Sequence, residues 1–283
     1  MKLKLIECPR DAMQGWANFI PTEKKIEYLN QLLKVGFDTL DFGSFVSPKA
    51  IPQMADTSLV YDALDLDNTD TKLLAIIANV RGAEIAVSFE KIQYLGFPFS
   101  ISETFQQRNT NSSITEAFKT VENIQNLCQK FDKQLVIYFS MGFGNPYGDA
   151  FNAEIVANWA EKMNELGIKI IALSDTVGVA DNQVITELFT GLIPQYTNIE
   201  FGAHFHATNN TWQMKIESAY QAGCRRFDGA IGGFGGCPMA EDELVGNINT
   251  QNIIQYFENQ EVKLDLNQYE FTKSVEISRN IFI

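Results

Sequence analysis

The chain contains only two histidines, His204 and His206, and a single residue separates them. They follow residues 199–203, a segment that is predicted to be a β-strand. In a strand, residues i and i+2 point to the same face, so both imidazole rings can bind one ion. Histidine is the commonest metal ligand, because its ring is largely neutral near physiological pH. An isolated H-x-H pair can equally be structural, but the residues around this pair favour a metal site.

Other polar residues fall where further predicted strands end. These positions are Arg10 and Asp11, Asp41, Ser140, the run Ser174, Asp175 and Thr176, and Asn247 in a later loop. In a barrel of parallel strands, such ends meet at one face. Two imidazoles, one carboxylate and one amide oxygen suit Mg, Mn, Co, Fe or Zn, and no thiolate is needed. A single aspartate at a strand end is more often a helix cap, but so many positions on one ring favour a functional site.

The segment after the last predicted strand is rich in glycine and ends at Cys237. Residues 229–236 contain five glycines. This composition is typical of a mobile lid. A phosphate-binding loop is the alternative, since barrels often build one after strands seven and eight. Both interpretations place the segment at the rim of the active site, and for Cys237 itself the alternative is an incidental buried thiol.

Strands and helices are expected to alternate along the whole chain. The strands are predicted at residues 3–8, 39–43, 72–78, 91–97, 135–139, 169–173, 199–204 and 225–231. The helices are predicted at residues 22–34, 56–64, 82–87, 114–130, 152–166, 182–193 and 211–222. Eight units, with no G-x-G-x-x-G turn after the first strand, favour a (β/α)8 TIM barrel over an open sheet. We expect one catalytic domain over residues 1–283, with the barrel at about 3–258, its metal site at the C-terminal face, and a short extension at about 259–283.

Composition excludes several classes of function. The net charge of −13 argues against nucleic acid as a partner. No segment approaches the roughly 18 apolar residues that cross a bilayer, so no membrane association is expected. The four cysteines form no C-x-x-C pair, and the start of the chain lacks the features of a signal peptide. Both observations favour a cytoplasmic protein with reduced thiols.

Several segments together resemble the 3-hydroxy-3-methylglutaryl-CoA lyase family. The matching segments are residues 7–14, 41–49, 52–54, 174–178, 204–206, 232–238 and 246–247. The similarity extends over about residues 3–258, and the runs Ser-Phe-Val-Ser-Pro-Lys and Gly-Gly-Cys-Pro are its specific signals. The Arg-Asp and H-x-H pairs are shared with the related acyl-CoA condensing synthases. The resemblance therefore implies a barrel metallolyase.

The resemblance also implies roles for individual residues. The implied ligands of a divalent cation are Asp11, His204, His206 and Asn247, with Mg or Mn expected and Zn or Co as alternatives. Arg10 would stabilise charge on the thioester oxygen, Cys237 would act as acid and base at the acetyl carbon, and Asp41 would assist them. We assign the substrate contacts to Arg10, Gln14, Ser140 and Asp175, although Asp175 can equally be a helix cap. His204 and Asp41 are both candidates to receive the hydroxyl proton of the substrate.

The implied reaction is the cleavage of 3-hydroxy-3-methylglutaryl-CoA, or a close analogue, to acetyl-CoA and acetoacetate. This would be a step of leucine degradation, in an enzyme expected to be a homodimer. A condensing synthase of the isopropylmalate or citramalate type is the alternative, and an inactive binding barrel is a third possibility. The chain departs from the family pattern at Ala12-Met13, at Asp41 in place of glutamate, at Ala207 in place of aspartate, and in the length of the loop between Cys237 and Asn247.

Overall fold

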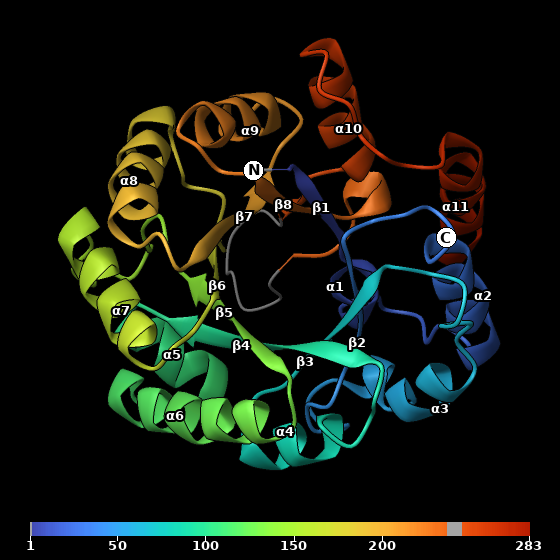
Figure 1. Cartoon of the computed structure of the whole chain (residues 1–283), viewed down its shortest axis with the longest axis horizontal. Coiled ribbons are helices and arrows are strands. Elements are labelled where there is room, and N and C mark those ends of the chain that lie inside the picture. Colours follow the sequence, from blue (N-terminus) through green and yellow to red (C-terminus); the bar gives the residue numbers. More distant parts are fainter. Residues whose placement is uncertain (1, 237–244) are drawn as a thin grey trace.

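The computed structural model describes residues 2–236 and 245–283, and within them eight parallel strands close into a barrel surrounded by helices (Figure 1). Strand β1 pairs with both β2 and β8, and the β6–β7 pairing completes the ring. The barrel strands are β1 (Lys4–Glu7), β2 (Thr39–Ser44), β3 (Lys72–Ile76), β4 (Ile92–Ser100), β5 (Gln134–Ser140), β6 (Ile170–Asp175), β7 (Glu200–Ala207) and β8 (Arg226–Gly229). The predicted (β/α)8 barrel is confirmed.

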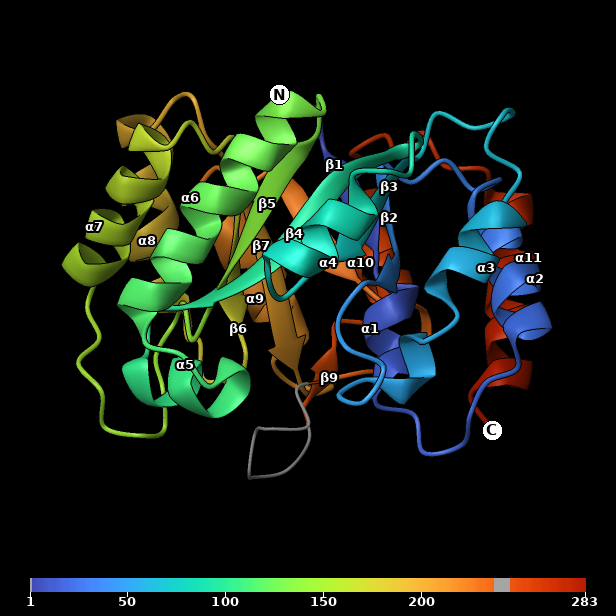
Figure 2. The same ribbon diagram turned by 90° about the horizontal axis from the view of Figure 1, so that it is seen from below.

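Most of the helices surround the barrel, whereas α1 (Pro9–Gln14) lies at one end of it (Figure 1 and Figure 2). The others are α2 (Thr22–Leu32), α3 (Thr57–Asp62), α4 (Val80–Ala86), α5 (Glu103–Thr110), α6 (Ile114–Lys130), α7 (Ala153–Glu165), α8 (Asn182–Gln195), α9 (Trp212–Gln221), α10 (Thr250–Asn259) and α11 (Gln268–Ile281), with short 3-10 turns η1 (Pro52–Met54) and η2 (Ile231–Gly233). All seven predicted helices are present, and α6 has the predicted bounds. Helices α1, α5 and α10 were not predicted, and α11 lies in the extension expected at about residues 259–283. Within the described residues, no helix combines the length and hydropathy of a membrane span.

Local sequence signals explain where several elements begin and end. Ser113 accepts a hydrogen bond from the backbone of Glu116 and completes a capping box, so α6 begins at Ile114. Asp181 caps α8 in the same manner through Val184. Gly36 has a φ of +92°, a conformation that strongly favours glycine, and it ends the segment after α2.

A ninth strand lies across the mouth of the barrel and was not predicted. Strand β9 (Gly246–Asn247) runs antiparallel to β7, and Asn247 pairs with His206. In the side view of Figure 2, β9 and α1 lie toward the same end of the barrel. Strand β7 also continues to Ala207, beyond its predicted end at residue 204, so both histidines lie within regular strand. The extra pairing brings a residue from the loop after β8 to the two histidines.

The C-terminal helix α11 packs against α2. Asn267 donates its backbone N–H to the carbonyl of Val35 over 2.8 Å, and the Gln31 amide donates to the carbonyl of Glu270 over 2.9 Å. Beyond the helix, the ring of Phe282 stacks on Phe234, with centroids 4.4 Å apart. Residues after 259 are therefore attached to the barrel and to the segment that follows η2.

Candidate active site

A cavity of about 390 Å³ opens at the carboxyl ends of the strands. Polar side chains that line it come from the first, fourth, fifth, sixth and seventh strand–loop units, and the apolar side chains come from the second, third and fourth. The lining residues are Arg10, Asp11, Gln14, Val46, Ala50, Ile51, Ile76, Ala78, Pro98, Phe105, Asn109, Thr110, Tyr138, Ser140, Ser174, Thr176, His204 and His206. One side of the cavity is thus suited to charge and the other to an apolar group.

His206 presents one ring nitrogen without a partner. Its Nδ1 lies 2.9 Å from the carbonyl oxygen of Thr176, which can only accept, so Nδ1 carries the hydrogen. Burial and the neighbouring His204 lower the pKa of His206, which keeps the ring neutral. Its Nε2 therefore carries a lone pair, and this buried atom has no hydrogen-bond partner among the described residues. A buried unpaired acceptor of this kind is what a metal ligand requires before its ion binds.

His204 projects from the same face of β7, with its ring centroid 5.5 Å from that of His206. Its Nδ1 lies 3.1 Å from Oδ2 of the buried Asp228 on β8. Burial acts against a charged ring, but Asp228 and Asp11 outweigh it and raise the pKa of His204. Ligand atoms of Asp11, His204 and His206 all lie within 4.8 Å of one another. The spacing allows one ion to be bound by all three.

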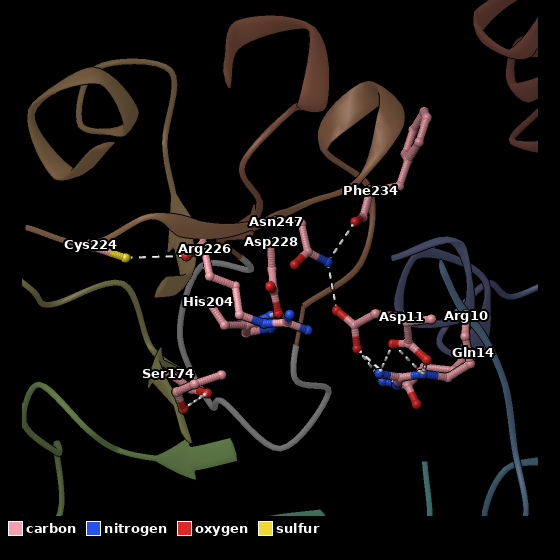
Figure 3. Close-up of polar contacts among 12 residues, drawn as sticks. Arg10, Asp11, Gln14, Ser174, His204, Cys224, Arg226, Asp228, Phe234 and Asn247 are labelled. Atoms are coloured by element: carbon pink, nitrogen blue, oxygen red, sulfur yellow. Dashed lines mark hydrogen bonds and ion pairs between the residues drawn. The ribbon is translucent and has the colours of Figure 1, made fainter. Parts of the chain in front are cut away.

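Asp11 follows β1 within helix α1, and donors surround its carboxylate. Arg10 Nη1 donates to Oδ1 over 3.0 Å and the Gln14 amide donates to the same atom over 2.8 Å. The Asn247 amide donates to Oδ2 over 2.6 Å (Figure 3). Although burial opposes ionisation, Arg10 and the two histidines hold the pKa of Asp11 at about 2. The carboxylate is charged and retains lone pairs for a cation.

The segment after η2 approaches Asp11 so closely that a side chain would not fit. Gly235 has a φ of +95°, and a Cβ there would lie 2.6 Å from the Asn247 amide nitrogen and 2.8 Å from the backbone oxygen of Asp11. The amide nitrogen of Asn247 also donates to the carbonyl of Phe234 over 3.0 Å. The glycine-rich segment thus supports both Asp11 and Asn247. Cys237 lies outside the described residues.

Arg10 is held by two carboxylates. Its Nε donates to both oxygens of Asp41, over 3.1 and 3.0 Å, and its Nη2 donates to Oδ2 of Asp41. Burial opposes the charge, but Asp41 and Asp11 raise the pKa of Arg10, so the guanidinium remains charged. Burial raises the pKa of Asp41 to about 6 despite its cationic partner. Of the five guanidinium N–H groups, the three engaged here leave two for a substrate.

The donor set fits a divalent cation. A charged carboxylate and two imidazoles, one with an orphaned lone pair, match the ligands that Mg, Mn, Co or Zn accept. Cys8, His204 and Asp228 form a second cluster with similar spacing. Burial and nearby carboxylates raise the pKa of the Cys8 thiol well above its usual range, which opposes the thiolate that metal binding requires. The cluster of Asp11, His204 and His206 is therefore the better site.

The structure brings most of the sequence-derived site residues to this cavity. Arg10, Asp11, Gln14, Ser140 and both histidines line it, and Asn247 contacts Asp11. Asp41 lies behind Arg10 and does not line the cavity. Asp175 also lies outside the lining: it accepts hydrogen bonds from the backbone of Val179 and Ala180 and from Lys215, and so supports the loop after β6.

Two residues of the site were not singled out from the sequence. Asp228 is hidden in the run Arg226-Phe-Asp-Gly229, where only its place two residues after a buried arginine hints that it faces the barrel interior. Glu7 accepts a hydrogen bond from the backbone of Ile231 over 2.8 Å and another from the Thr250 hydroxyl over 2.6 Å. It therefore fixes the start of the segment after β8. Neither contact follows from local sequence pattern.

A closed parallel barrel with a carboxylate–histidine cluster at the carboxyl ends of its strands has the architecture of a barrel enzyme. Comparison with known proteins gives the family. The HMGL-like family model matches residues 3–278. The chain belongs to the HMGL-like family.

Relatives with assigned names share nearly the full length of the chain. The chain is 33% identical over 258 residues to hydroxymethylglutaryl-CoA lyase YngG of Bacillus subtilis, covering 91% of this chain and 85% of that enzyme. It is 28% identical to a 3-hydroxy-3-isohexenylglutaryl-CoA/hydroxymethylglutaryl-CoA lyase of Pseudomonas aeruginosa, covering 89% and 84%. The solved structure of an HMG-CoA lyase from Acinetobacter baumannii, in complex with coenzyme A and 3-methylmalate, superimposes with a TM-score of 0.92 at 29% identity and covers 99% of this chain and 91% of that one.

Proposed function

We propose that the protein is a divalent-metal-dependent lyase that cleaves 3-hydroxy-3-methylglutaryl-CoA, or a close analogue, to acetyl-CoA and acetoacetate. The observation that carries this proposal is a charged arginine, Arg10, beside the cluster of Asp11, His204 and His206 in one cavity. The names of the relatives support the same substrate class. The apolar wall of the cavity accommodates the methyl group, or a longer substituent in an analogue.

Asp11, His204, His206 and Asn247 are proposed to hold the cation. Mg or Mn is favoured, because a chelating hydroxy acid requires free coordination positions beside the protein ligands, and Zn and Co are the alternatives. When bound, the cation would lower the pKa of the substrate hydroxyl and orient the substrate. The Asn247 side chain donates to Asp11 and to Phe234 through its nitrogen, which leaves its oxygen as the ligand atom. That oxygen would complete the ligand set.

Arg10 is proposed to stabilise the enolate of acetyl-CoA. Its side chain lines the cavity and is positively charged. Asp41 holds the guanidinium in place by accepting hydrogen bonds from its Nε and Nη2. Negative charge develops on the thioester oxygen as the carbon–carbon bond breaks, so the donors act most strongly in the transition state. Asp41 would act by positioning Arg10. Of the two candidates for the hydroxyl proton, only His204 lines the cavity.

Cys237 is proposed to protonate the enolate carbon. The support for this role is the sequence motif Gly-Gly-Cys-Pro, which follows residues whose described part contacts Asp11 and Asn247. A thiol is a stronger acid than a hydroxyl, which suits proton transfer to carbon near neutral pH. Ser140 and Gln14, which line the cavity, are proposed substrate contacts. Asp175 would contribute by supporting the loop after β6.

The deciding experiment is a substrate assay with purified protein. We expect release of acetyl-CoA from 3-hydroxy-3-methylglutaryl-CoA in the presence of Mg²⁺ or Mn²⁺ and a thiol reductant, and its loss when a chelator is added. Condensation of acetyl-CoA with a 2-oxo acid, without cleavage, would identify a synthase of the isopropylmalate or citramalate type. No turnover in either direction would support an inactive binding barrel.

We propose further that the enzyme acts in the cytoplasm as a homodimer. Support for the compartment comes from the cysteines, since the three in the described part of the chain are free and buried. Light scattering coupled to gel filtration should give twice the chain mass of 31.8 kDa. A monomeric mass would contradict the dimer. Fractionation of the source cells tests the compartment.

A further inference from the structure

Asp228 is a buried carboxylate inside the barrel that contacts a proposed metal ligand. It lies on β8, its side chain has no solvent exposure, and its Oδ2 is 3.1 Å from Nδ1 of His204. The imidazole itself lies between two other rings, those of Tyr138 and His206, each with its centroid 5.5 Å away. The orientation of the ring is therefore constrained, and Asp228 is the group that determines whether Nδ1 carries a hydrogen.

A buried arginine provides the opposite charge. Arg226 precedes Asp228 by two residues on β8, so both project from the same face of the strand. Burial opposes the charge on Arg226, but Asp228, Glu200 and Asp38 are among the groups that raise its pKa, so it remains a cation. Nη1 of Arg226 lies 3.3 Å from Glu200 and 3.8 Å from Asp38, at the opposite end of the barrel from the cavity. The guanidinium of Arg226 is thus a cation on the same strand face as the carboxylate of Asp228.

A carboxylate oxygen accepts hydrogen bonds, so Oδ2 of Asp228, 3.1 Å from the ring, calls for an N–H at Nδ1. Nδ1 of His204 must then donate, and in a neutral ring the lone pair is left on Nε2. We propose that Asp228 is the positioning residue that fixes His204 in this tautomer and orientation, so that Nε2 is directed to the cavity. The role of Nε2 there rests on the proposed function, but the tautomer does not. His206 reaches the same tautomer by another route, through the backbone carbonyl of Thr176.

The two histidines allow a direct test, because each gives a single imidazole signal set. We would label the protein with ¹⁵N-histidine and record long-range ¹H–¹⁵N spectra without metal, at a pH above the titration range of both rings. The expected result is hydrogen on Nδ1 in both rings of the wild type. In Asp228→Ala, His204 should become a mixture of tautomers while His206 stays unchanged. Hydrogen on Nε2 of His204 in the wild type, or an unchanged His204 in Asp228→Ala, would overturn the proposal.

Metal affinity gives a second readout. Loss of a carboxylate that orients a ligand histidine typically weakens metal binding by about 10–100-fold, and we expect Mn²⁺ affinity to fall by this amount in Asp228→Ala and less in Asp228→Asn, which keeps an acceptor oxygen. Cys8→Ala removes a neighbouring side chain from the same cluster, and Asp56→Asn removes another buried carboxylate, one that pairs with Lys25. Both controls should retain Mn²⁺ affinity. Equal weakening in Cys8→Ala would show a general disturbance of the barrel and contradict the proposal.

The tautomer spectra and the Mn²⁺ affinities test the role of Asp228 separately from the proposed lyase activity. If Asp228→Ala does not fold, the wild-type spectrum and the Asp228→Asn variant still decide the tautomer. A wild-type protein that binds no Mn²⁺ but shows the expected tautomers would refute the metal-dependent lyase and leave the role of Asp228 intact.

Discussion

The charged side chains are paired differently at the two ends of the barrel. At the amino ends of the strands, Lys4 pairs with Glu200, Lys72 lies 3.0 Å from Asp38, and Arg226 reaches both carboxylates. Cations and anions alternate there, and each has a partner of opposite sign.

At the carboxyl ends, the ionisable groups are not compensated in this manner. Asp11 and Asp41 share one guanidinium, that of Arg10, and Asp228 contacts the imidazole of His204. Nε2 of His206 has no partner within the described part of the chain. The first arrangement stabilises the fold, and the second leaves room for a cation and an anionic substrate. Substitutions at the two ends should therefore separate stability from activity.

Among substitutions at the carboxyl ends of the strands, His206→Ala should cause the largest loss of activity. The variant removes the imidazole with the orphaned nitrogen, and we expect turnover to fall by more than the ~10²–10³-fold typical of losing one oxyanion donor. Mn²⁺ binding, measured by electron paramagnetic resonance, should weaken by at least the ~10–100-fold seen when an outer partner is lost. Metal binding equal to that of the wild type would contradict the assignment of the site.

Arg10→Met should lower kcat by about 10²–10³-fold. The variant removes donors that act on charge developing in the transition state, while Asp11 and the histidines remain to bind Mn²⁺. Arg10→Lys should restore little activity, because an ammonium lacks the planar fork that Asp41 holds. A change confined to KM would instead identify Arg10 as a clamp for the phosphate or carboxylate of the substrate.

Cys237→Ser should keep metal binding and lose most of the turnover, by about 10²-fold or more if the thiol is the general acid. Mass spectrometry after limited alkylation should find Cys237 modified first. The other thiols are buried, and burial raises the pKa of Cys128 and of Cys224 to about 12. Full activity in Cys237→Ala would remove the main argument for a lyase over a synthase.

At the opposite end of the barrel, Glu200→Gln should reduce the free energy of unfolding by about 2 kcal/mol, between the effects of breaking a surface pair and a buried pair. Glu200 neutralises Lys4 and the fully buried Arg226, so its loss leaves the arginine with a weaker counter-charge. Denaturant titration measures the effect. Mn²⁺ affinity should be unchanged, and a parallel loss of metal binding would mean that the two ends are coupled.

The smallest expected effect is on the pH dependence of stability. Burial raises the pKa of Glu7 from 4.5 to about 8, although Thr250 and Ile231 donate hydrogen bonds to its carboxyl. The folded state then binds this proton more tightly than the unfolded state, so the contribution to stability is present below pH 4.5 and is lost as the pH rises toward 8. From pH 6 to pH 7 the wild type should lose about 1.4 kcal/mol relative to Glu7→Gln, measured by denaturant titration. Equal slopes in both proteins would contradict the raised pKa.

Sequence periodicity was sufficient for the barrel, because each strand–helix unit carries its own signal. Helix α6 shows this best: a capping box at Ser113 and Glu116 and a regular apolar face define both of its ends. Strand β9 has only two residues and exists because β7 offers an edge to Asn247, so no local pattern announces it. Helix α1 has only six residues, and its Pro9 fits a turn as readily as a helix start.

The same limit applies to the site. The H-x-H pair and Asp11 could be predicted because strand geometry places them on one face at one end of the barrel. The partners that orient them could not. Asp228 contacts His204 only because of the register of β7 and β8, which is set when the barrel closes. The carboxylate of Asp41 binds Arg10 and does not face the cavity. Sequence gives the reactive groups, while the contacts that fix their protonation depend on tertiary pairing.

The aromatic cluster at the end of the chain has an optical consequence. Trp16 lies edge-on to Phe234 at 5.6 Å and to Phe282 at 5.2 Å between ring centroids. Its indole therefore contacts both the glycine-rich segment beside Asp11 and the residues after α11. With Trp159 and Trp212 replaced by phenylalanine, the tryptophan fluorescence would come from this one indole alone. Its stopped-flow emission would then report any movement of that segment on substrate binding, without an added dye.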